Sequence, residues 1–171
     1  MKQSNKRNKG TFYLTQAALI AAIYVVLVFL FRPISFSLFQ VRIAEALTVL
    51  PYFIPAAVPG VTIGCLLANI LGEADMLDII FGTLATLLGT LGSYGLRRYK
   101  FLVPIPPIVA NTIIIPWVLR FAYGEALPIH FMMLTVGIGE VISCFGLGMI
   151  LLYSLEAYKR YVFSPSSFNN N

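Results

Sequence analysis

The segment Phe12–Phe31, FYLTQAALIAAIYVVLVFLF, decides the fold class, because it carries no charged side chain over a length that can cross a lipid bilayer. A transmembrane helix needs about 20 predominantly apolar residues, whereas the apolar core of a secretory signal has only about 7–15. No A-x-A-like cleavage site follows the segment. We therefore expect a transmembrane helix here and not a removable signal peptide.

The composition of the whole chain indicates an integral membrane protein. Of its 171 residues, 58% are hydrophobic and 11% are charged, and the mean hydropathy is +0.84. A soluble globular domain contains about 25% charged residues, so this chain cannot cover a water-facing surface. We predict an all-α protein with a basic N-terminal segment at 1–11, six transmembrane helices in one bundle at 12–160, and a disordered tail at 161–171. After the first helix, the expected helices are Ala44–Phe53, Ala56–Leu71, Leu77–Leu96, Pro106–Tyr123 and Phe131–Tyr158.

The basic residues are divided unequally between the two sides of the predicted bundle. One side would contain both termini and the loop near residue 98, with Lys2, Lys6, Arg7, Lys9, Arg97, Arg98, Lys100, Lys159 and Arg160. The other side would contain Arg32, Arg42 and Arg120. Because cytoplasmic loops are enriched in Lys and Arg, we expect a multi-pass protein of the cell membrane with both termini in the cytoplasm. Sorting in the membrane then accounts for the net charge of +5 without a nucleic-acid partner.

Glu140 is the most informative polar residue, because it lies inside the last apolar segment. At a rise of about 1.5 Å per residue it would be roughly 13 Å from the start of that helix. A charge near the middle of a bilayer costs on the order of 2.5–3.5 kcal/mol on insertion scales. Gly137 and Gly139 beside it would let a ligand or another backbone approach closely. We interpret Glu140 as a binding residue that faces a cavity.

Four other residues in or beside the apolar segments each allow a structural and a functional interpretation. Asn69 and Asn111 could form interhelical hydrogen bonds or contact a ligand. Asp78 could stabilise a helix N-terminus or bind a ligand. Trp117 could anchor its helix at the membrane interface or stack on a flat ligand.

An arginine and a glutamate precede the second apolar segment, in the stretch VRIAEALTVLPYF from Val41 to Phe53. Arg42 and Glu45 are three residues apart, which places them on one face of a helix. They could form an ion pair, anchor a helix end, or belong to a site for a polar ligand. Gln40 lies just before them and is a candidate contact of the same site.

Small residues on the first helix indicate a close helix–helix contact. Ala17 and Ala21 form one small-xxx-small pair, and Ala18 and Ala22 form another. Such pairs allow helices in lipid to approach closely, either within the chain or at a separate membrane subunit.

Motifs for catalysis, metal binding and nucleotide binding are missing from the sequence. There is no GxxxxGK[ST], HExxH or GxSxG motif and no Cys/His metal spacing. Cys65 and Cys144 lie in apolar segments, and we expect them to be packing residues. We therefore predict a non-enzymatic binding protein without a cofactor or metal, which needs a separate source of energy.

Three stretches of the sequence resemble the queuosine-precursor transporter (QueT) family. They are RIAEALTVLPYFIPAAVPGVTIGCLLANILG, LDIIFGTLATLLGTLGSYGLR and PIPPIVANTIIIPW, within a resemblance that extends from about Ala17 to Leu152. Members of this family are substrate-binding S-components of energy-coupling factor (ECF) transporters. The segment AALIAA is similar to the alanine motif by which S-components dock on their transmembrane partner.

The resemblance implies a six-helix bundle that captures a 7-deazaguanine base, such as queuine, outside the cell. A transmembrane scaffold subunit (the T component) and two ATPase subunits would complete the importer. A deazaguanine offers two adjacent N–H donors, a carbonyl acceptor, a flat face and, in several precursors, an ammonium group. We expect one of Glu45 and Glu140 to read the ring edge and the other to meet the ammonium. The wider site would also include Asn69, Asn111, Asp78, Arg42, Gln40 and Trp117.

Other functions fit the same sequence. The chain could be an S-component for a different vitamin-like nutrient, or a small self-sufficient secondary transporter. A membrane enzyme using Glu45, Glu140 and Asp78, or a scaffold protein, has less support because no paired catalytic motif is present.

Overall fold

The computed structural model describes residues 2–32 and 41–158, with side chains from Lys9 onward. Every regular element within these residues is helical. In chain order the elements are α1 (Lys2–Leu30), η1 (Ile43–Tyr52), α3 (Ala57–Leu71), η2 (Asp78–Gly82), α4 (Thr83–Gly95), η3 (Lys100–Leu102), α5 (Ile105–Ala122), α6 (Ile129–Glu140), η4 (Val141–Leu147) and α7 (Gly148–Ala157). Because η2 continues directly into α4, and α6 continues through η4 into α7, the elements other than the short η3 correspond in order to the six predicted helices.

The described residues contain three helices that are long and apolar enough to cross a membrane, namely Lys9–Leu30, Lys100–Ala122 and Ile129–Ala157. The helices Ile43–Tyr52 and Ala57–Leu71 are also apolar but shorter. The all-helical class is thus confirmed, whereas a count of six membrane crossings stays a prediction. The predicted tail at 161–171 lies outside the described residues.

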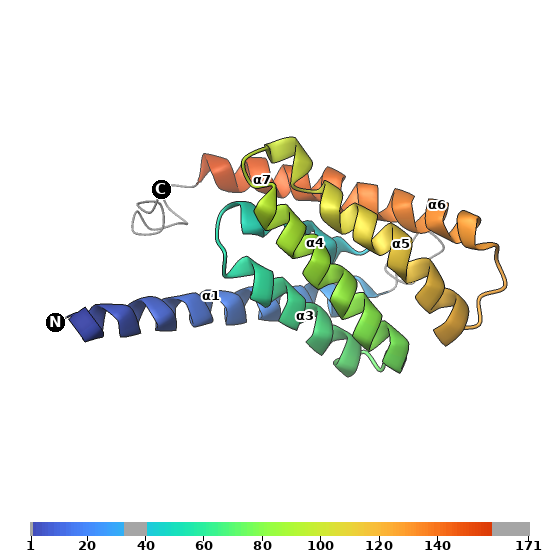
Figure 1. Ribbon diagram of the computed structural model, residues 1–171, viewed down its shortest axis with the longest axis horizontal. Helices are drawn as coiled ribbons and strands as arrows, with labels where there is room; N and C mark the ends of the chain where they lie inside the picture. The colour runs from blue at the N-terminus through green and yellow to red at the C-terminus, as the bar shows by residue number, and fades with distance from the viewer. Residues whose placement is uncertain (1, 33–40, 159–171) are drawn as a thin grey trace.

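The first helix begins at Lys2, ten residues before the start that hydrophobicity predicted. Apolar residues mark only the part of a helix that can lie in lipid. Residues 2–11 continue the same backbone hydrogen bonds without being apolar. Figure 1 shows this part of α1 projecting beyond the rest of the bundle.

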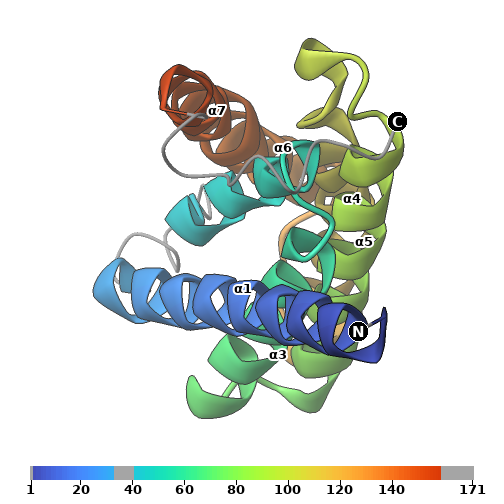
Figure 2. The ribbon, with the colours of Figure 1, turned by 90° about the vertical axis from the view of Figure 1, so that its left-hand side faces the viewer.

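The second helix, η1, is a 3₁₀ helix and not the α-helix that the sequence predicted at Ala44–Phe53. A 3₁₀ helix rises about 2.0 Å per residue and an α-helix about 1.5 Å, so ten residues span roughly 20 Å and not 15 Å. Residues 44–51 are all buried, and η1 contacts α1, α3, α4, α7 and η4. Figure 2 shows η1 between α1 and the continuous α6–α7 helix. This helix is therefore an internal element of the bundle.

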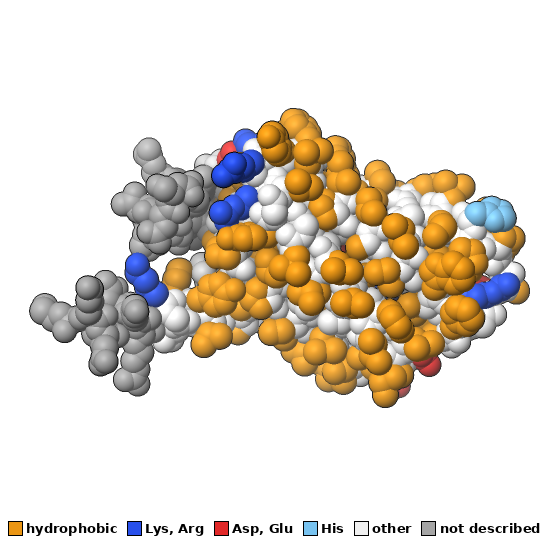
Figure 3. Space-filling view, in the orientation of Figure 1, with side chains coloured by type: hydrophobic (Ala, Val, Ile, Leu, Met, Phe, Trp, Pro, Cys, Tyr) orange, Lys and Arg blue, Asp and Glu red, His pale blue; other side chains and the backbone are white. Residues whose placement is uncertain are grey.

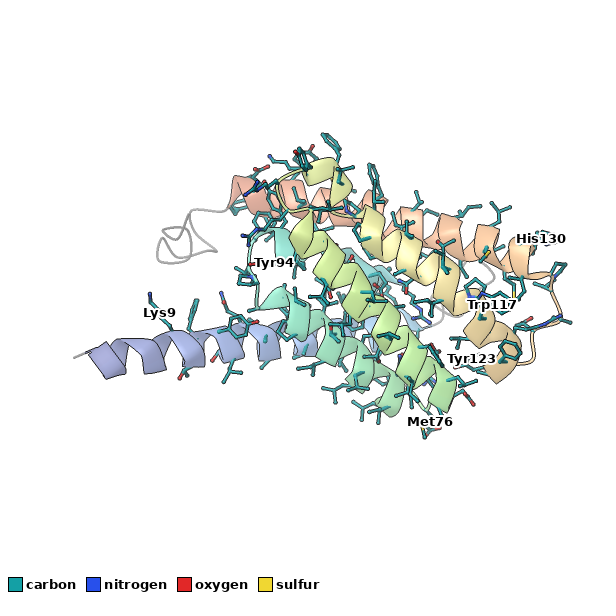
Figure 4. All side chains as sticks on the ribbon, in the orientation of Figure 1. Lys9, Met76, Tyr94, Trp117, Tyr123 and His130 are labelled. Carbon is teal, nitrogen blue, oxygen red and sulfur yellow. The ribbon has the colours of Figure 1, made fainter. Side chains whose placement is uncertain are left out.

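The two ends of the molecule differ in charge. The N-terminus of α1 and the C-terminal end of α7 lie at the same end (Figure 1), where basic side chains gather in Figure 3. Arg97 and Arg98 are exposed in the connection after α4, close to the labelled Tyr94 of Figure 4. His130 lies at the opposite end, and apolar side chains cover much of the surface between the ends (Figure 3). This arrangement fits a chain that crosses a bilayer an even number of times.

One of the two alanine pairs on α1 is used inside the chain. Ala17 and Ala21 are buried at 7% and 5% exposure, against α3, whereas Ala18 and Ala22 are exposed. A Cβ atom added to Gly64 of α3 would lie 2.7 Å from Cβ of Tyr24 and 3.1 Å from Cα of Ala21. The absence of a side chain at Gly64 thus allows α1 and α3 to pack closely.

We expect Gly64→Ala to lower the free energy of unfolding by about 1–3 kcal/mol, because the added methyl group overpacks the α1–α3 contact. Gly95→Ala is the matched control, since a Cβ atom there meets no atom within 4 Å. Denaturation of the purified variants in detergent, followed by circular dichroism, measures both changes. Equal stability of the two variants would contradict the close contact.

Candidate functional site

Two acidic side chains meet at the centre of the bundle. Glu45 of η1 is 0% exposed and Glu140, at the end of α6, is 3% exposed. One terminal oxygen of each carboxyl group and the Sγ atom of Cys144 all lie within 4.8 Å of one another. The structure therefore brings together the two residues for which the sequence predicted the main binding roles.

Neighbouring side chains hold the two carboxyl groups in place. The Tyr24 hydroxyl donates a hydrogen bond to Oε1 of Glu45 at 2.7 Å. The Cys144 thiol donates to Oε2 of Glu140 at 3.2 Å and lies 3.6 Å from the backbone carbonyl of Glu45. Thr48 donates to the same carbonyl at 2.6 Å. Cys144 is thus a polar contact of the cluster as well as a packing residue.

Several polar atoms in this interior have no hydrogen-bond partner among the described residues. They include Oε2 of Glu45 and Nδ2 of Asn111. Asn111 is 1% exposed and lies beside Glu140. A buried polar group without a partner costs about 1–3 kcal/mol, and folded proteins contain few of them. The buried acceptor of Glu45 that lacks a partner among the described residues, together with the Asn111 amide beside Glu140, indicates a binding site for a polar ligand.

A second polar group surrounds Asp78, which is 5% exposed at the start of η2. Nη2 of Arg42 lies 3.9 Å from Oδ2 of Asp78. The Tyr123 hydroxyl donates to the same oxygen at 3.1 Å, and Asn69 donates to the backbone carbonyl of Asp78 at 3.4 Å. Oδ1 of Asp78 has no hydrogen-bond partner within the described residues 2–32 and 41–158. The acidic partner of Arg42 is therefore Asp78, and the ion pair with Glu45 that the sequence allowed is not formed.

Tyr123 links this group to the loop before η2. Its hydroxyl accepts a hydrogen bond from the backbone N–H of Asp75 at 3.3 Å. Burial raises the pKa of the Tyr123 phenol above its ordinary value, so the hydroxyl remains protonated at neutral pH and can donate to Asp78. Figure 4 places Tyr123 at the end of the molecule opposite Lys9. The polar residues around Asp78 therefore form the end of the site that lies farther from the basic end of the molecule.

A cavity of about 40 Å³ lies beside Asp78 and reaches as far as Tyr24. Tyr24 lines this cavity and also donates to Glu45. The other polar side chains that line it are Arg32, Arg42, Asn69 and Asp78. Since a cavity of this size holds only a few water molecules, a larger ligand can enter only if the lining side chains move.

One of the predicted site residues, Trp117, is not part of this arrangement. Trp117 is 48% exposed, and its ring stacks on Phe121 with centroids 6.2 Å apart. Together with Phe81 and Ile113, these rings line a separate apolar groove on the outside of the bundle. Gln40 lies outside the described residues.

All three buried acids occur where the chain departs from α-helical geometry. Glu45 lies in the 3₁₀ helix η1, Asp78 begins the π-helical segment η2, and Glu140 immediately precedes the π-helical segment η4. Such π-helical turns are rare and occur frequently at functional sites. The backbone thus supports the assignment of these residues to one site.

Comparison with known proteins gives the family. The family model for the QueT transporter matches residues 14–157, from α1 to the end of α7. The chain belongs to the QueT transporter family. The resemblance found in the sequence is thereby confirmed, and the protein is a member of a family of membrane transporters.

One curated relative adds a more specific comparison. The chain is 34% identical, over 98 residues, to the protein named Queuosine precursor transporter QueT of Lactococcus lactis subsp. cremoris (strain MG1363). This alignment covers 56% of the present chain and 57% of the relative. No solved structure matches the chain.

Proposed function

We propose that this QueT family member is the substrate-binding S-component of an ECF-type importer, and that it captures a queuosine precursor outside the cell. Its ligand would be a 7-deazaguanine base such as queuine. The name of the Lactococcus relative supports the substrate class, and the family match supports transport. The ATPase subunits and the scaffold subunit of the importer would supply the energy.

The observation that carries this proposal is the set of unpaired polar groups inside the bundle. Unpaired carboxyl oxygens of Glu45 and Asp78 can accept hydrogen bonds, and the unpaired amide nitrogen of Asn111 can donate one. A deazaguanine base offers the complementary N–H groups and carbonyl oxygen. Hydrogen bonds to a charged group are roughly twice as strong as neutral ones. Such a site also rejects analogues that leave its buried polar groups unpaired.

The charge distribution supports an orientation with the site open to the outside. Basic side chains gather at the end that contains both described chain ends (Figure 3), and basic ends of membrane proteins face the cytoplasm. The cavity beside Asp78 lies toward the opposite end, with Tyr123 (Figure 4). A ligand would therefore enter from outside the cell and pass the Arg42–Asp78 pair before reaching Glu45.

Calorimetry with the purified chain tests the substrate class. We expect queuine and simpler 7-deazaguanines to bind, whereas guanine, riboflavin and thiamine bind weakly or not at all. Glu140→Gln should weaken the binding of queuine, which carries an ammonium group, by about tenfold or more, which corresponds to about 1.4 kcal/mol. A heat of binding with riboflavin or thiamine, but with no deazaguanine, would show that the chain binds another nutrient. The absence of heat with every deazaguanine, from a folded chain, would overturn the proposal.

The exposed alanines of α1 offer a surface for the scaffold subunit. Because Ala17 and Ala21 pack inside the chain, we assign the docking role to Ala18 and Ala22, which are exposed. We expect Ala22→Trp to lower uptake in cells that contain the whole importer by about tenfold, because the larger side chain blocks close helix contact. Binding of ligand by the purified variant should not change.

The control for this prediction is Ile150→Trp, at a position on α7 that is 65% exposed. Uptake by this variant should remain normal, since the substitution adds the same ring to another exposed surface. Normal uptake by Ala22→Trp would show that this face of α1 is not the docking surface. Loss of ligand binding in Ala22→Trp would show instead that the substitution damages the bundle.

A further inference from the structure

The spacing of the two central carboxyl groups suggests which part of the ligand they bind. We propose that Glu45 and Glu140 act together as a single binding site for the ammonium group of the ligand, and that the ring edge is recognised nearer Asp78. This inference rests on the proposed function, because it assumes a 7-deazaguanine ligand. It replaces the expectation that one of the two glutamates reads the ring edge while the other meets the ammonium.

The first argument is the distance between the acceptors. The two carboxyl groups present oxygens within 4.8 Å of each other. A charge-assisted N–H···O bond is about 2.8 Å long, so two oxygens bonded to one tetrahedral nitrogen lie about 4.6 Å apart. Oxygens no more than 4.8 Å apart are therefore close enough for one ammonium to bond to both carboxyl groups.

The same distance disfavours separate roles for the two glutamates. In a 7-aminomethyl-7-deazaguanine, the adjacent N–H donors and the aminomethyl nitrogen lie on opposite sides of the ring carbonyl. Carboxyl groups that bound these two features separately would be held apart by the ring. Glu45 and Glu140 would have to move away from each other to accept such a ligand, whereas an ammonium fits their present separation.

The second argument is the pattern of partners around the pair. The Tyr24 hydroxyl donates a hydrogen bond to Oε1 of Glu45, and the Cys144 thiol donates one to Oε2 of Glu140. Oε2 of Glu45 accepts no hydrogen bond from the part of the chain that the structure describes, although its side chain is fully buried. Arg42 is the basic side chain that acts on this cluster, but its guanidinium faces Asp78. The pair thus has acceptors in place and, within the described part of the chain, lacks a cation of its own.

The third argument is the position of the remaining polar groups. The cavity next to Tyr24 leads outward to Asp78 and Asn69. Oδ1 of Asp78 is an acceptor for ring N–H donors that has no partner among the described residues. The Asn69 amide could donate to the ring carbonyl in exchange for its 3.4 Å bond to the Asp78 backbone carbonyl. A ligand with its ammonium at the glutamate pair would place its ring in this direction.

Two ligands that differ in charge test the inference by calorimetry. One is 7-aminomethyl-7-deazaguanine, which carries the ammonium, and the other is 7-cyano-7-deazaguanine, which is neutral. We expect the wild-type chain to bind the aminomethyl base about tenfold or more tightly than the cyano base. Glu45→Gln and Glu140→Gln should each remove most of this preference while changing the affinity for the cyano base by less than about threefold.

Two further variants complete the comparison. Asp78→Asn should weaken both bases by a similar factor, because both have the same ring edge. Glu125→Gln is the matched control, since Glu125 is an exposed acid outside the bundle interior, and it should change neither affinity. Circular dichroism and a thermal unfolding curve establish that each variant is folded.

The outcomes separate this inference from the proposed function. One glutamine variant could weaken the binding of both bases equally while the other weakens only the binding of the aminomethyl base. The glutamates would then have separate roles, and the inference would be wrong. Equal binding of both bases by the wild-type chain also overturns it, and that measurement needs no variant to fold. If neither base binds to the folded wild-type chain, the proposed function itself fails.

Discussion

Replacing Glu140 by glutamine is expected to stabilise the ligand-free chain, even though it weakens ligand binding. The glutamine amide could donate a hydrogen bond to Oε2 of Glu45, which has no partner in the structure. Satisfying a buried polar group of this kind is worth about 1–3 kcal/mol, and the change also removes any repulsion between two neighbouring carboxylates. We expect the free energy of unfolding to rise by about 1–3 kcal/mol, measured by denaturation in detergent without ligand.

The same experiment with ligand completes the prediction. The stabilisation that 7-aminomethyl-7-deazaguanine adds should be smaller in Glu140→Gln than in the wild-type chain, because ligand stabilisation depends on affinity. Glu125→Gln should change neither quantity, since that residue is exposed. A ligand-free Glu140→Gln chain that is less stable than the wild type would show that the carboxyl group is mainly structural, through its contact with Cys144.

The helical fold was predictable because each apolar run is long compared with the loops between runs. The expected start of the first helix at Phe12 was wrong, since α1 begins at Lys2. Hydrophobicity indicates where a helix can lie in lipid, whereas backbone hydrogen bonds determine where it begins. The 3₁₀ geometry of η1 could not be predicted either, because it depends on packing against five other elements.

The candidate site was predictable where a polar residue interrupts an apolar segment. Glu140 and Asn111 were identified in this way, and Glu45 from its place with Arg42 at the head of the second apolar segment. The structure brings these three residues together. The ion pair of Arg42 with Asp78 joins residues that are distant in sequence, and spacing along one helix could indicate only Glu45 as a partner.

Other contacts of the site had weaker signals. Tyr24 and Cys144 lie in apolar helices, where such residues usually pack, and hydrophobicity does not distinguish the two roles. For Cys144 the available signal was its spacing, since residues four apart on a helix can touch, as Cys144 and Glu140 do. Likewise, the sequence does not reveal whether a lone Trp near a helix end faces the interior of the bundle or its outer surface. The Trp117 side chain lies on the outer surface.

The contact between α4 and α5 should be the least tolerant of added volume. A Cβ atom on Gly89 would lie 2.7 Å from Cα of Pro107, which is a backbone atom and cannot rotate away. We therefore expect Gly89→Leu to force the two helices apart and to lower the free energy of unfolding by about 3 kcal/mol or more, at or above the usual cost of overpacking. Asn111 is on α5, one turn after Pro107, so its position relative to Glu140 should change as well.

Two measurements on Gly89→Leu distinguish the separation of α4 and α5 from any destabilisation that a leucine would cause elsewhere on the helix. Denaturation in detergent gives the stability, and calorimetry gives the affinity for a deazaguanine, which we also expect to fall. Gly95→Leu is the matched control, because it lies at the end of the same helix and a Cβ atom there meets no atom within 4 Å. That variant should be as stable as the wild type or slightly more so, since leucine favours a helix more than glycine does. Equal stability of Gly89→Leu and Gly95→Leu would show that α4 and α5 are not in close contact at Pro107. The contact at Pro107 would then not be what fixes the position of Asn111 relative to Glu140.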